Sequence, residues 1–374
     1  MNRIYNYIKS YSITYNSLLK LKKIYEDTNG KKILVFTHAM NEGGAPLVLW
    51  EALKLIAEKG FSIFVISSCD GKLCHYSENN IYTFVAKRPL SVIRKHLLRY
   101  KWDSIIVNTL IMYKWIQAFP CVKTSWWIHE GNTYIEKLKN KLPPNLNSNI
   151  SVYCVSEWTK ECLERHGFHY NTKVLYYGIE DNMCKNNQKN ENDFLTFLFI
   201  GALCDRKNQL FFLEAIERMK SSLQSKCQFI IIGDRIKGYE IYAEQVLEKI
   251  NMMQCNIKYI NRVNHDEISK VYAKADVVVS CSVDDPLPVV VTEAFMNSKC
   301  TILSSNSGQS RIVSNYINAL VYKADSKSQL INLLEYIVEL DKNDIEKIGY
   351  NGRKLYEKYF SIDVFKKNVF NLIS

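Results

Sequence analysis

Three carboxylates stand close together in the stretch SVDDPLPVVVTEAFMNS, which runs from Ser282 to Ser298. Asp285 and Glu293 are eight residues apart, so a mostly helical path would separate them by about 12 Å. The paired carboxylates of a glycosidase need about 5 to 10 Å. The spacing therefore favours an extended ligand that is held by its hydroxyls at both ends. In the alternative interpretation, Asp285 caps the helix and Glu293 pairs with a lysine.

A pair of cations lies in a second stretch, FIGALCDRKNQ. Gly201 ends an expected strand, and Arg206 and Lys207 precede a helix that starts near Asn208. Two cations beside free helix amides make a pyrophosphate clamp, with Lys207 as a point charge and Arg206 able to bind in a forked geometry. The alternative is a solvated surface pair with no ligand.

A flexible turn, Gly43–Gly44, follows the first expected strand in THAMNEGGAPLVLW, and Pro46 suits the first turn of the next helix. Amides at such a helix start can hold a phosphate. The G-x-G-x-x-G spacing of a dinucleotide site is absent, which argues against a dehydrogenase. The turn is equally compatible with a simple tight connection.

These residues follow strands in a chain where β-rich runs alternate with helical patterns. The first half contains KILVFTH, FSIFVIS, SIIVN, TSWWIH and ISVYCVS, and the second half contains FLTFLFIG, QFIIIGD, NIKYI, DVVVSCS, TILSS and ALVY. Such alternation predicts parallel sheets covered by helices on both faces. The polar run CKNNQKNEND interrupts the pattern. We therefore expect two doubly wound domains, with ligands at the carboxyl ends of their strands in a cleft between them.

Charge and composition limit the partners. The chain has 49 basic and 38 acidic residues, a net charge of +11, which favours anionic partners such as nucleotides or phosphorylated substrates. Basic residues are dispersed and no nucleic-acid recognition motif is present, so we expect no nucleic-acid partner. Eleven scattered cysteines indicate a reduced, cytoplasmic chain. No apolar run is long enough to span a bilayer. The first 30 residues predict either a basic amphipathic helix on anionic lipid or a helix packed on its own domain.

Taken together, these motifs resemble the GT-B glycosyltransferases, and specifically glycosyltransferase family 4. That family carries two glutamates separated by seven residues after a strand, and here DPLPVVVTE has Asp285 and Glu293 at that spacing. GGAPLVL resembles the family's glycine loop, WWIHEG its histidine loop, VYCVSEWTKECL and KVLYYGIE its approach to the linker, and GALCDRKN its phosphate-binding turn. NSGQSRIV followed by NALVY is similar to its second-domain phosphate loop. The resemblance covers most of the chain.

The resemblance implies an α/β GT-B fold of two Rossmann-like domains facing across a cleft. The amino-terminal, acceptor-side domain would comprise residues 1–183, with a helix of residues 357–374 crossing back to it. Residues 184–193 would be the linker, and residues 194–356 the nucleotide-sugar domain.

Roles for individual residues also follow from the resemblance. Lys207 would neutralise the diphosphate with Arg206 beside it, Asp285 would lie near the hydroxyls of the transferred sugar, and His129 would contact that sugar. The residues implied in donor binding are Gly43, Gly44, Gly201, Arg262, Val263, Pro288, Glu293 and Gly308. Of these, Glu293 would bind the ribose, and Gly308 and its neighbours would supply amides to the phosphates. His129 as a core histidine and Gly308 as a simple turn are the alternatives.

The implied reaction moves a hexose from a nucleoside-diphosphate sugar to a hydroxyl of a glycan or lipid-linked acceptor, with retention at the anomeric carbon. No cofactor is expected, and the absence of an Asp-x-Asp triplet favours transfer without a metal ion. The Asn-, Lys- and Ile-rich composition suggests bacterial surface polysaccharide synthesis, in the cytoplasm or at the inner face of the membrane.

Three departures from the family pattern keep other functions open. Asp285 is one methylene shorter than the usual glutamate, Ala202 stands where an arginine often follows the glycine, and Arg311 stands where a glutamate is common. The last two favour a noncatalytic partner subunit of an active transferase. A nucleotide-sugar epimerase of the same architecture is the remaining alternative.

Overall fold

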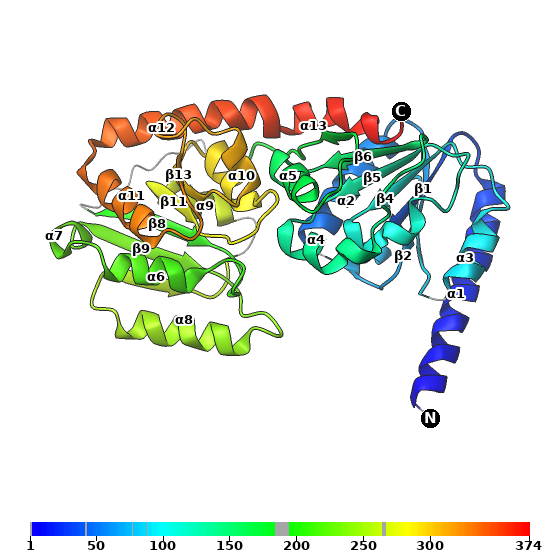
Figure 1. Ribbon diagram of the computed structural model, residues 1–374, viewed down its shortest axis with the longest axis horizontal. Coiled ribbons are helices and arrows are strands. Elements are labelled where there is room, and N and C mark those ends of the chain that lie inside the picture. Colours follow the sequence, from blue (N-terminus) through cyan, green and yellow to red (C-terminus); the bar gives the residue numbers. More distant parts are fainter. Residues whose placement is uncertain (1, 42, 77, 88, 184–193, 264–266) are drawn as a thin grey trace. The chain divides into compact units, whose positions relative to one another are not determined.

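The structure is a computed structural model that describes residues 2–374 except 42, 77, 88, 184–193 and 264–266; for residues 2–9 it describes only the backbone. The chain divides into two compact units (Figure 1). Unit 1 comprises Met1–Tyr177 and Phe365–Ser374, and unit 2 comprises Gly178–Val364. Each unit contains one parallel β-sheet covered by helices.

The sheet of unit 1 has seven strands in the order β3-β2-β1-β4-β5-β6-β7, and all neighbouring pairs are parallel. The strands are β1 (Lys32–Thr37), β2 (Ser62–Ser67), β3 (Ile81–Val85), β4 (Ser104–Asn108), β5 (Thr124–Ile128), β6 (Ile150–Cys154) and β7 (Thr172–Val174). The helices are α1 (Asn2–Asp27), α2 (Gly44–Ala57), η1 (Lys72–His75), α3 (Leu90–Leu97), η2 (Leu110–Trp115), α4 (Asn132–Leu138), η3 (Lys139–Lys141) and α5 (Glu157–Arg165).

The helices of unit 1 cover both faces of the sheet because the strands are apolar on both sides. One face forms a core with α1, α3, η2, α4 and α5, in which Phe36, Phe64 and Trp126 are fully buried. The opposite face carries α2 and the returning carboxyl terminus, where Tyr153 Oη donates to the Asn371 carbonyl at 2.7 Å. α2 ends at Ala57, and Gly60 completes the turn at a φ of +85° with its N–H donating to the Ala57 carbonyl.

Unit 2 has a six-stranded sheet in the order β10-β9-β8-β11-β12-β13, again with only parallel pairs. The strands are β8 (Leu195–Ile200), β9 (Cys227–Ile232), β10 (Ile257–Ile260), β11 (Val277–Ser280), β12 (Cys300–Ser304) and β13 (Leu320–Tyr322). The helices are α6 (Gln209–Glu217), α7 (Ser221–Gln224), α8 (Glu240–Met252), α9 (Ile268–Ala273), α10 (Val289–Met296), η5 (Gly308–Arg311), α11 (Lys327–Glu339), α12 (Lys342–Leu355) and η6 (Tyr356–Phe360). After them, α13 (Ile362–Asn368) crosses from unit 2 into unit 1, and η7 (Val369–Leu372) ends the chain.

The expected strands are all present, and the structure adds two short ones, β3 and β7. The division between the units falls at Tyr177 and Phe365, whereas the sequence placed it at residues 183 and 357. The expected linker, residues 184–193, lies outside the described residues.

The alternative interpretation in which Asp285 caps the helix is wrong. The path from Asp285 to Glu293 is helical only from Val289, because residues that precede Pro286 and Pro288 are disfavoured in the α conformation. Asp285 therefore does not cap this helix; Pro288 occupies the N-cap position.

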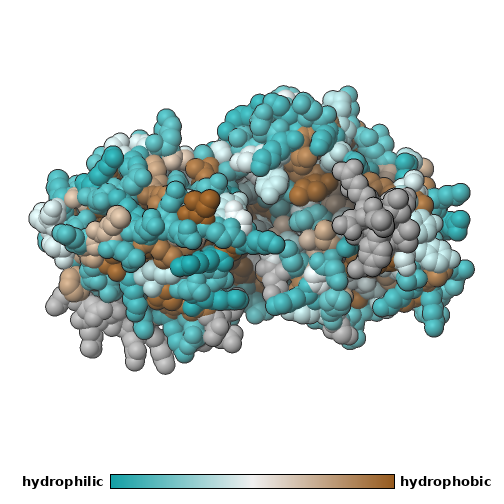
Figure 2. All heavy atoms as spheres, turned by 90° about the horizontal axis from the view of Figure 1, so that it is seen from below, coloured by the Kyte–Doolittle hydropathy of each residue, from teal (hydrophilic) through white to brown (hydrophobic). Residues whose placement is uncertain are grey.

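The described cysteines are all free, and most are buried. Among the described residues no helix is long and apolar enough to span a bilayer. On the face drawn in Figure 2, hydrophilic side chains predominate and apolar ones form small separate patches.

Candidate active site

The carboxyl ends of β8 and β11 lie side by side in unit 2. The chain runs from β8 outward through β9 and β10 and then returns to β11 on the other side of β8. The strand order reverses between β8 and β11, and the ends of strands at such a point are where doubly wound sheets bind ligands. The loop after β8 carries Arg206 and Lys207, and the loop after β11 carries Asp285.

Asp285 joins the two cations. Its Oδ2 accepts a hydrogen bond from Arg206 Nη1 at 2.7 Å and one from Lys207 Nζ at 2.8 Å. Asp285 is only 7% exposed. Burial by itself would raise its pKa, but the charges of Lys207 and Arg206 outweigh burial and hold the pKa of Asp285 below its ordinary value. The carboxylate is therefore ionised at neutral pH and fixes both cations at the strand ends.

Gly201 makes room for Lys207. A Cβ at Gly201 would lie 3.3 Å from Cγ and Cδ of Lys207, so the lysine stem crosses the backbone where a side chain is missing. Gly233 packs still more tightly, because a Cβ there would lie 2.0 Å from the Gly201 carbonyl oxygen. Gln209, at the start of α6, donates to the carbonyls of Gly201 and Ala202 at 3.0 and 2.9 Å. These contacts fix the turn from which Lys207 projects.

The turn after β12 is hydrogen-bonded to the loop that carries Asp285. The Gly308 N–H donates to the Asp285 carbonyl at 3.0 Å, and the Asp285 N–H donates to the Asn306 carbonyl at 3.1 Å. Gln309 Nε2 donates to the Pro288 carbonyl at 2.9 Å and to Thr292 Oγ1 at 3.0 Å. The Gly308 amide is thus already hydrogen-bonded within the chain. The binding of phosphate by backbone amides remains a prediction for the residues next to Gly308.

Glu293, the second acid of the spaced pair, lies on α10 and is half-buried. Its Oε2 accepts a hydrogen bond from the hydroxyl of Tyr272 at 2.8 Å. Tyr272 is fully buried, and burial together with the neighbouring carboxylate raises the pKa of its phenol well above the ordinary value. The tyrosine therefore remains a hydrogen-bond donor that orients Glu293.

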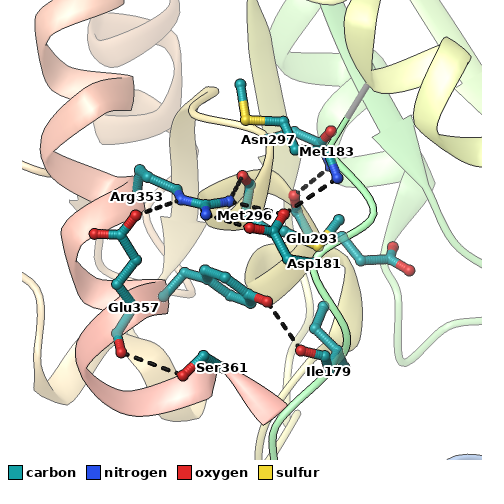
Figure 3. Close-up of polar contacts among 10 residues, drawn as sticks. Ile179, Asp181, Met183, Glu293, Met296, Asn297, Arg353, Glu357 and Ser361 are labelled. Carbon is teal, nitrogen blue, oxygen red and sulfur yellow. Dashed lines mark hydrogen bonds and ion pairs between the residues drawn. The ribbon is translucent and has the colours of Figure 1, made fainter. Parts of the chain in front are cut away.

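The far end of α10 is anchored by Arg353, as Figure 3 shows. Arg353 Nη1 donates to the Met296 carbonyl at 2.6 Å, and its Nε donates to Glu357 at 2.9 Å. Its guanidinium also forms an ion pair with Asp181. Asn297 Nδ2 donates to the Glu293 carbonyl at 2.8 Å. Arg353 thereby ties the helix that carries Glu293 to α12 and to the segment that enters unit 2.

In unit 1, His129 lies at the carboxyl end of β5. Its ring is 4.5 Å from that of Trp127, and its Nε2 is buried without a hydrogen-bond partner among the described residues. Burial, with a smaller contribution from His38, lowers the pKa of His129 to about 3. The imidazole is therefore neutral at physiological pH, and its Nε2 is one of the few buried polar atoms that lack a partner among the described residues.

A buried acid next to it, Glu130, was missed by the sequence analysis. Its Oε2 accepts the N–H of Leu110 at 2.8 Å and that of His129 at 3.0 Å, which joins the ends of β4 and β5. Thr109, before Leu110, has a φ of +75°, a strained conformation for a β-branched residue. Burial raises the pKa of Glu130 to about 7. Its position directly after a histidine at a strand end was the available sequence signal.

Gly43 and Gly44 lie at the start of α2, and Gly43 is the N-cap residue. The Gly43 N–H donates to Asn41 Oδ1 at 3.2 Å. Its φ of −83° is accessible to any residue, so backbone conformation does not require glycine. A Cβ at Gly44 would meet nothing within 4 Å. At Gly43, by contrast, a Cβ would lie 3.1 Å from Asn41 Oδ1, so only Gly44 borders open space.

The remaining residues predicted to bind the donor follow β10, an edge strand of the sheet of unit 2. Arg262 and Val263 follow β10; Arg262 is exposed and lies 3.8 Å from a carboxylate oxygen of Asp234. Arg311, which departs from the family pattern, donates to the Ser305 carbonyl at 2.7 Å. No cluster of His, Cys, Asp or Glu suited to a metal ion occurs in the part of the chain that the structure describes.

Comparison with known families covers nearly the whole chain in two pieces. Residues 29–191 match the family model described as "Glycosyl-transferase family 4", and residues 181–355 match the one described as "Glycosyl transferases group 1". The two matches divide the chain close to the boundary between the two units.

Two curated proteins are similar in sequence. A Campylobacter jejuni enzyme, named as an α-1,4-N-acetyl-D-galactosaminyltransferase that acts on a GalNAc-containing diNAcBac-PP-undecaprenol, is 30% identical over 179 residues, 47% of each chain. The match thus spans about half of that relative. The Staphylococcus aureus capsular polysaccharide biosynthesis glycosyltransferase CapH is 24% identical over 88% of this chain and 99% of its own.

Solved glycosyltransferases share the fold. Anabaena HepE, solved in complex with UDP and glucose, has a TM-score of 0.74 at 18% identity and covers 91% of this chain and 99% of its own. WaaG, described as involved in lipopolysaccharide biosynthesis, has a TM-score of 0.68 at 13% identity and covers 91% and 99%. The expected GT-B fold of two Rossmann-like domains is confirmed.

Proposed function

Because this chain belongs to the glycosyltransferases, with family 4 matched by its first half and group 1 by its second, we propose that it transfers a hexose from a nucleoside-diphosphate sugar with retention at the anomeric carbon. The acceptor is a hydroxyl of a glycan or of a lipid-linked saccharide.

The observation that carries this proposal is the junction of Lys207, Arg206 and Asp285 at the carboxyl ends of β8 and β11. Breaking the bond between sugar and diphosphate builds negative charge on the β-phosphate, so catalysis needs fixed positive groups there. The ammonium of Lys207 has three donors, and one of them reaches Asp285. The others are available to phosphate oxygens, with the lysine already oriented before the donor binds.

Transfer without a metal ion is part of the same proposal. Two protein cations at the strand ends would do what a divalent ion does elsewhere, which is to neutralise the departing diphosphate. The half-buried Glu293, oriented by Tyr272, would accept hydrogen bonds from the ribose hydroxyls. His129, neutral and with an unsatisfied Nε2, would bind a hydroxyl of the transferred sugar.

Names of the similar proteins support a role in polysaccharide synthesis. CapH is named for capsular polysaccharide biosynthesis, and the Campylobacter jejuni relative is named for a saccharide linked to undecaprenol. We propose a bacterial surface polysaccharide as the product and the cytoplasmic side of the membrane as the place of reaction.

Contact of α1 with an anionic membrane is a further part of this proposal. Tyr11, Tyr15 and Leu19 lie four residues apart and are 43%, 52% and 48% exposed, so they form one apolar stripe along the helix. Lys22 and Lys23 lie three and four residues after Leu19, on the same side of the helix, and are exposed. A basic helix with an aromatic stripe binds an anionic interface.

A screen of nucleotide sugars tests the function. A ligand that binds only the native state raises the melting temperature, so the donor is the nucleotide sugar that gives the largest increase. Incubation of that donor with lipid-linked saccharides should then give a product whose anomeric configuration, read by NMR, matches that of the donor.

The same experiment separates the alternatives. Interconversion of free donors without an acceptor would indicate an epimerase. No melting shift with any nucleotide sugar, and no transfer by the purified chain, would indicate a noncatalytic partner subunit and would refute the proposal.

A further inference from the structure

A pocket of about 490 Å³ opens in unit 1 between α3 and η2. Leu90, Arg94 and Leu98 line it from α3 and its C-cap, and Lys114 and Trp115 line it from η2. The three α3 residues are spaced by four, so they share one face of the helix. Ile93 and Leu97, between them, are buried in the core. The pocket is therefore lined by the side of α3 that faces away from the core. The opposite side of α3 is held in place by its packing in the core.

The charge of the pocket has one sign. Arg94, Lys95 and Lys114 line it, and no carboxylate is among its described lining residues. Arg94 is held in place because its Nε donates to the Ala118 carbonyl at 3.2 Å. Among the described residues no ion pair of these three cations is found, in contrast to Arg206 and Lys207, which share Asp285. Three cations with no carboxylate among the described lining residues give the pocket a positive potential, which attracts an anion.

The lining of the pocket also has an apolar part. Leu98 is 51% exposed and Leu90 is 37% exposed, while Trp115 is 5% exposed. A free phosphate has no apolar part that would contact the exposed leucines. An anionic group attached to hydrocarbon satisfies both features, because cations reach the charged group while leucines bury apolar surface.

We propose that this pocket binds the phosphate-bearing head group of an anionic lipid in a membrane, with Leu90 and Leu98 in contact with the hydrocarbon next to it. The pocket shares no lining residue with the strand-end residues assigned to the sugar donor or with the stripe on α1. Its occupant is a membrane lipid and not a soluble phosphate.

Vesicle binding by the purified full-length chain tests the proposal without any sugar donor, so it does not depend on catalysis. We expect co-sedimentation with vesicles containing phosphatidylglycerol and little with pure phosphatidylcholine. The double variant Lys95→Glu/Lys114→Glu should bind the anionic vesicles at least about twentyfold more weakly, from about fivefold for each lysine near an anionic surface. Leu98→Ser should also weaken binding, since it removes apolar contact but no charge.

The matched control is Lys59→Glu/Lys173→Glu. It makes the same change of charge in unit 1, but Lys59 follows α2 on the opposite face of the sheet and Lys173 lies on the edge strand β7. All four lysines are exposed, and unchanged thermal unfolding of each variant shows that the fold is retained.

Several results would overturn the proposal. The proposal is wrong if the pocket variants bind anionic vesicles as tightly as the wild type does. It is also wrong if the control variant loses as much binding as the pocket variant, or if the wild type does not bind anionic vesicles. Leu98→Ser with full binding, combined with calorimetric binding of inorganic phosphate that Lys95→Glu/Lys114→Glu abolishes, would identify a soluble anion as the occupant instead.

Discussion

Lys207 Nζ lies 2.8 Å from Asp285 Oδ2, although 78 residues separate them in the chain. The same oxygen accepts Arg206 Nη1 at 2.7 Å. One buried carboxylate thus orients two cations from the loop after the neighbouring strand, before any ligand is bound. Electrostatic catalysis depends on charges that are in place in advance, since reorientation during the reaction would cost energy.

Replacement of Asp285 by Asn should destabilise the fold in a pH-dependent way. The folded pKa of Asp285 is lowered, so its ion pairs contribute stability above the unfolded pKa of about 3.9, and this contribution is lost as the pH falls through the folded pKa. We expect a loss of about 3 kcal/mol in unfolding free energy at neutral pH, at the low end of the range for a buried pair that loses one partner, because the Arg206 side chain is 47% exposed. Urea unfolding between neutral pH and about pH 3 measures it. An equal difference between wild type and variant at all pH values would contradict the assignment.

Lys207→Ala should lower turnover by orders of magnitude while the chain stays folded. The lysine side chain is 16% exposed and neutralises the departing diphosphate in the proposed mechanism. Steady-state kinetics with the identified donor give the result. The control is Lys258→Ala, which removes an exposed lysine on the edge strand β10. Wild-type turnover of Lys207→Ala would remove the electrostatic account.

Gly201→Ala should reduce activity with little change in stability. The new Cβ would lie 3.3 Å from the Lys207 stem, and a flexible stem can move by a few tenths of an ångström. Such a shift displaces the ammonium from its position at the strand ends. Gly233→Ala provides the contrast, because its Cβ would lie 2.0 Å from the Gly201 carbonyl oxygen and the backbone must move. Thermal melting should fall strongly for Gly233→Ala only.

Glu130→Gln should change how stability depends on pH. Burial raises the folded pKa of Glu130 to about 7, so its contribution is fully present below the unfolded pKa of about 4.3 and is lost as the pH rises through 7. The wild type should therefore lose up to about 4 kcal/mol relative to the variant between about pH 4 and pH 8, at 1.36 kcal/mol per unit of pKa. Urea unfolding of both chains at several pH values measures the difference. A constant difference would show that Glu130 does not titrate in this range.

Arg353→Lys should destabilise unit 2 despite the retained charge. A lysine cannot reach the Met296 carbonyl, Glu357 and Asp181 together, because these contacts use separate nitrogens of the planar guanidinium. We expect a loss of about 2 kcal/mol in unfolding free energy, from charge-assisted hydrogen bonds at about 1.5–3 kcal/mol each with partial replacement by lysine. The exposed Arg218→Lys in the same unit is the control. Equal melting temperatures for the two variants would mean that the anchor on α10 contributes little.

The order of elements was predictable from local pattern. Buried parallel strands are continuous apolar runs, and the helices between them are followed by turn residues such as Gly60, so the two doubly wound domains could be recognised from the sequence. The positions of Arg206, Lys207 and Asp285 in loops after strands, and of Glu293 on the helix that follows, came from the same pattern. β3 and β7 were missed, since IYTFV and TKV are short runs next to polar turns.

Which of these side chains meet was decided only by the tertiary structure. Asp285 joins Lys207 because β11 pairs with β8, and strand order is set by packing across the sheet and not by distance along the chain. The sequence signal at Glu130, an acid directly after a histidine at a strand end, did not reveal its role, since that role depends on the buried amides of Leu110 and His129 that it accepts. The sequence by itself determined the periodicity, and therefore the fold class and the loops that carry chemistry. Burial and long-range contacts, which depend on the whole chain, determined the charge state and partner of each residue.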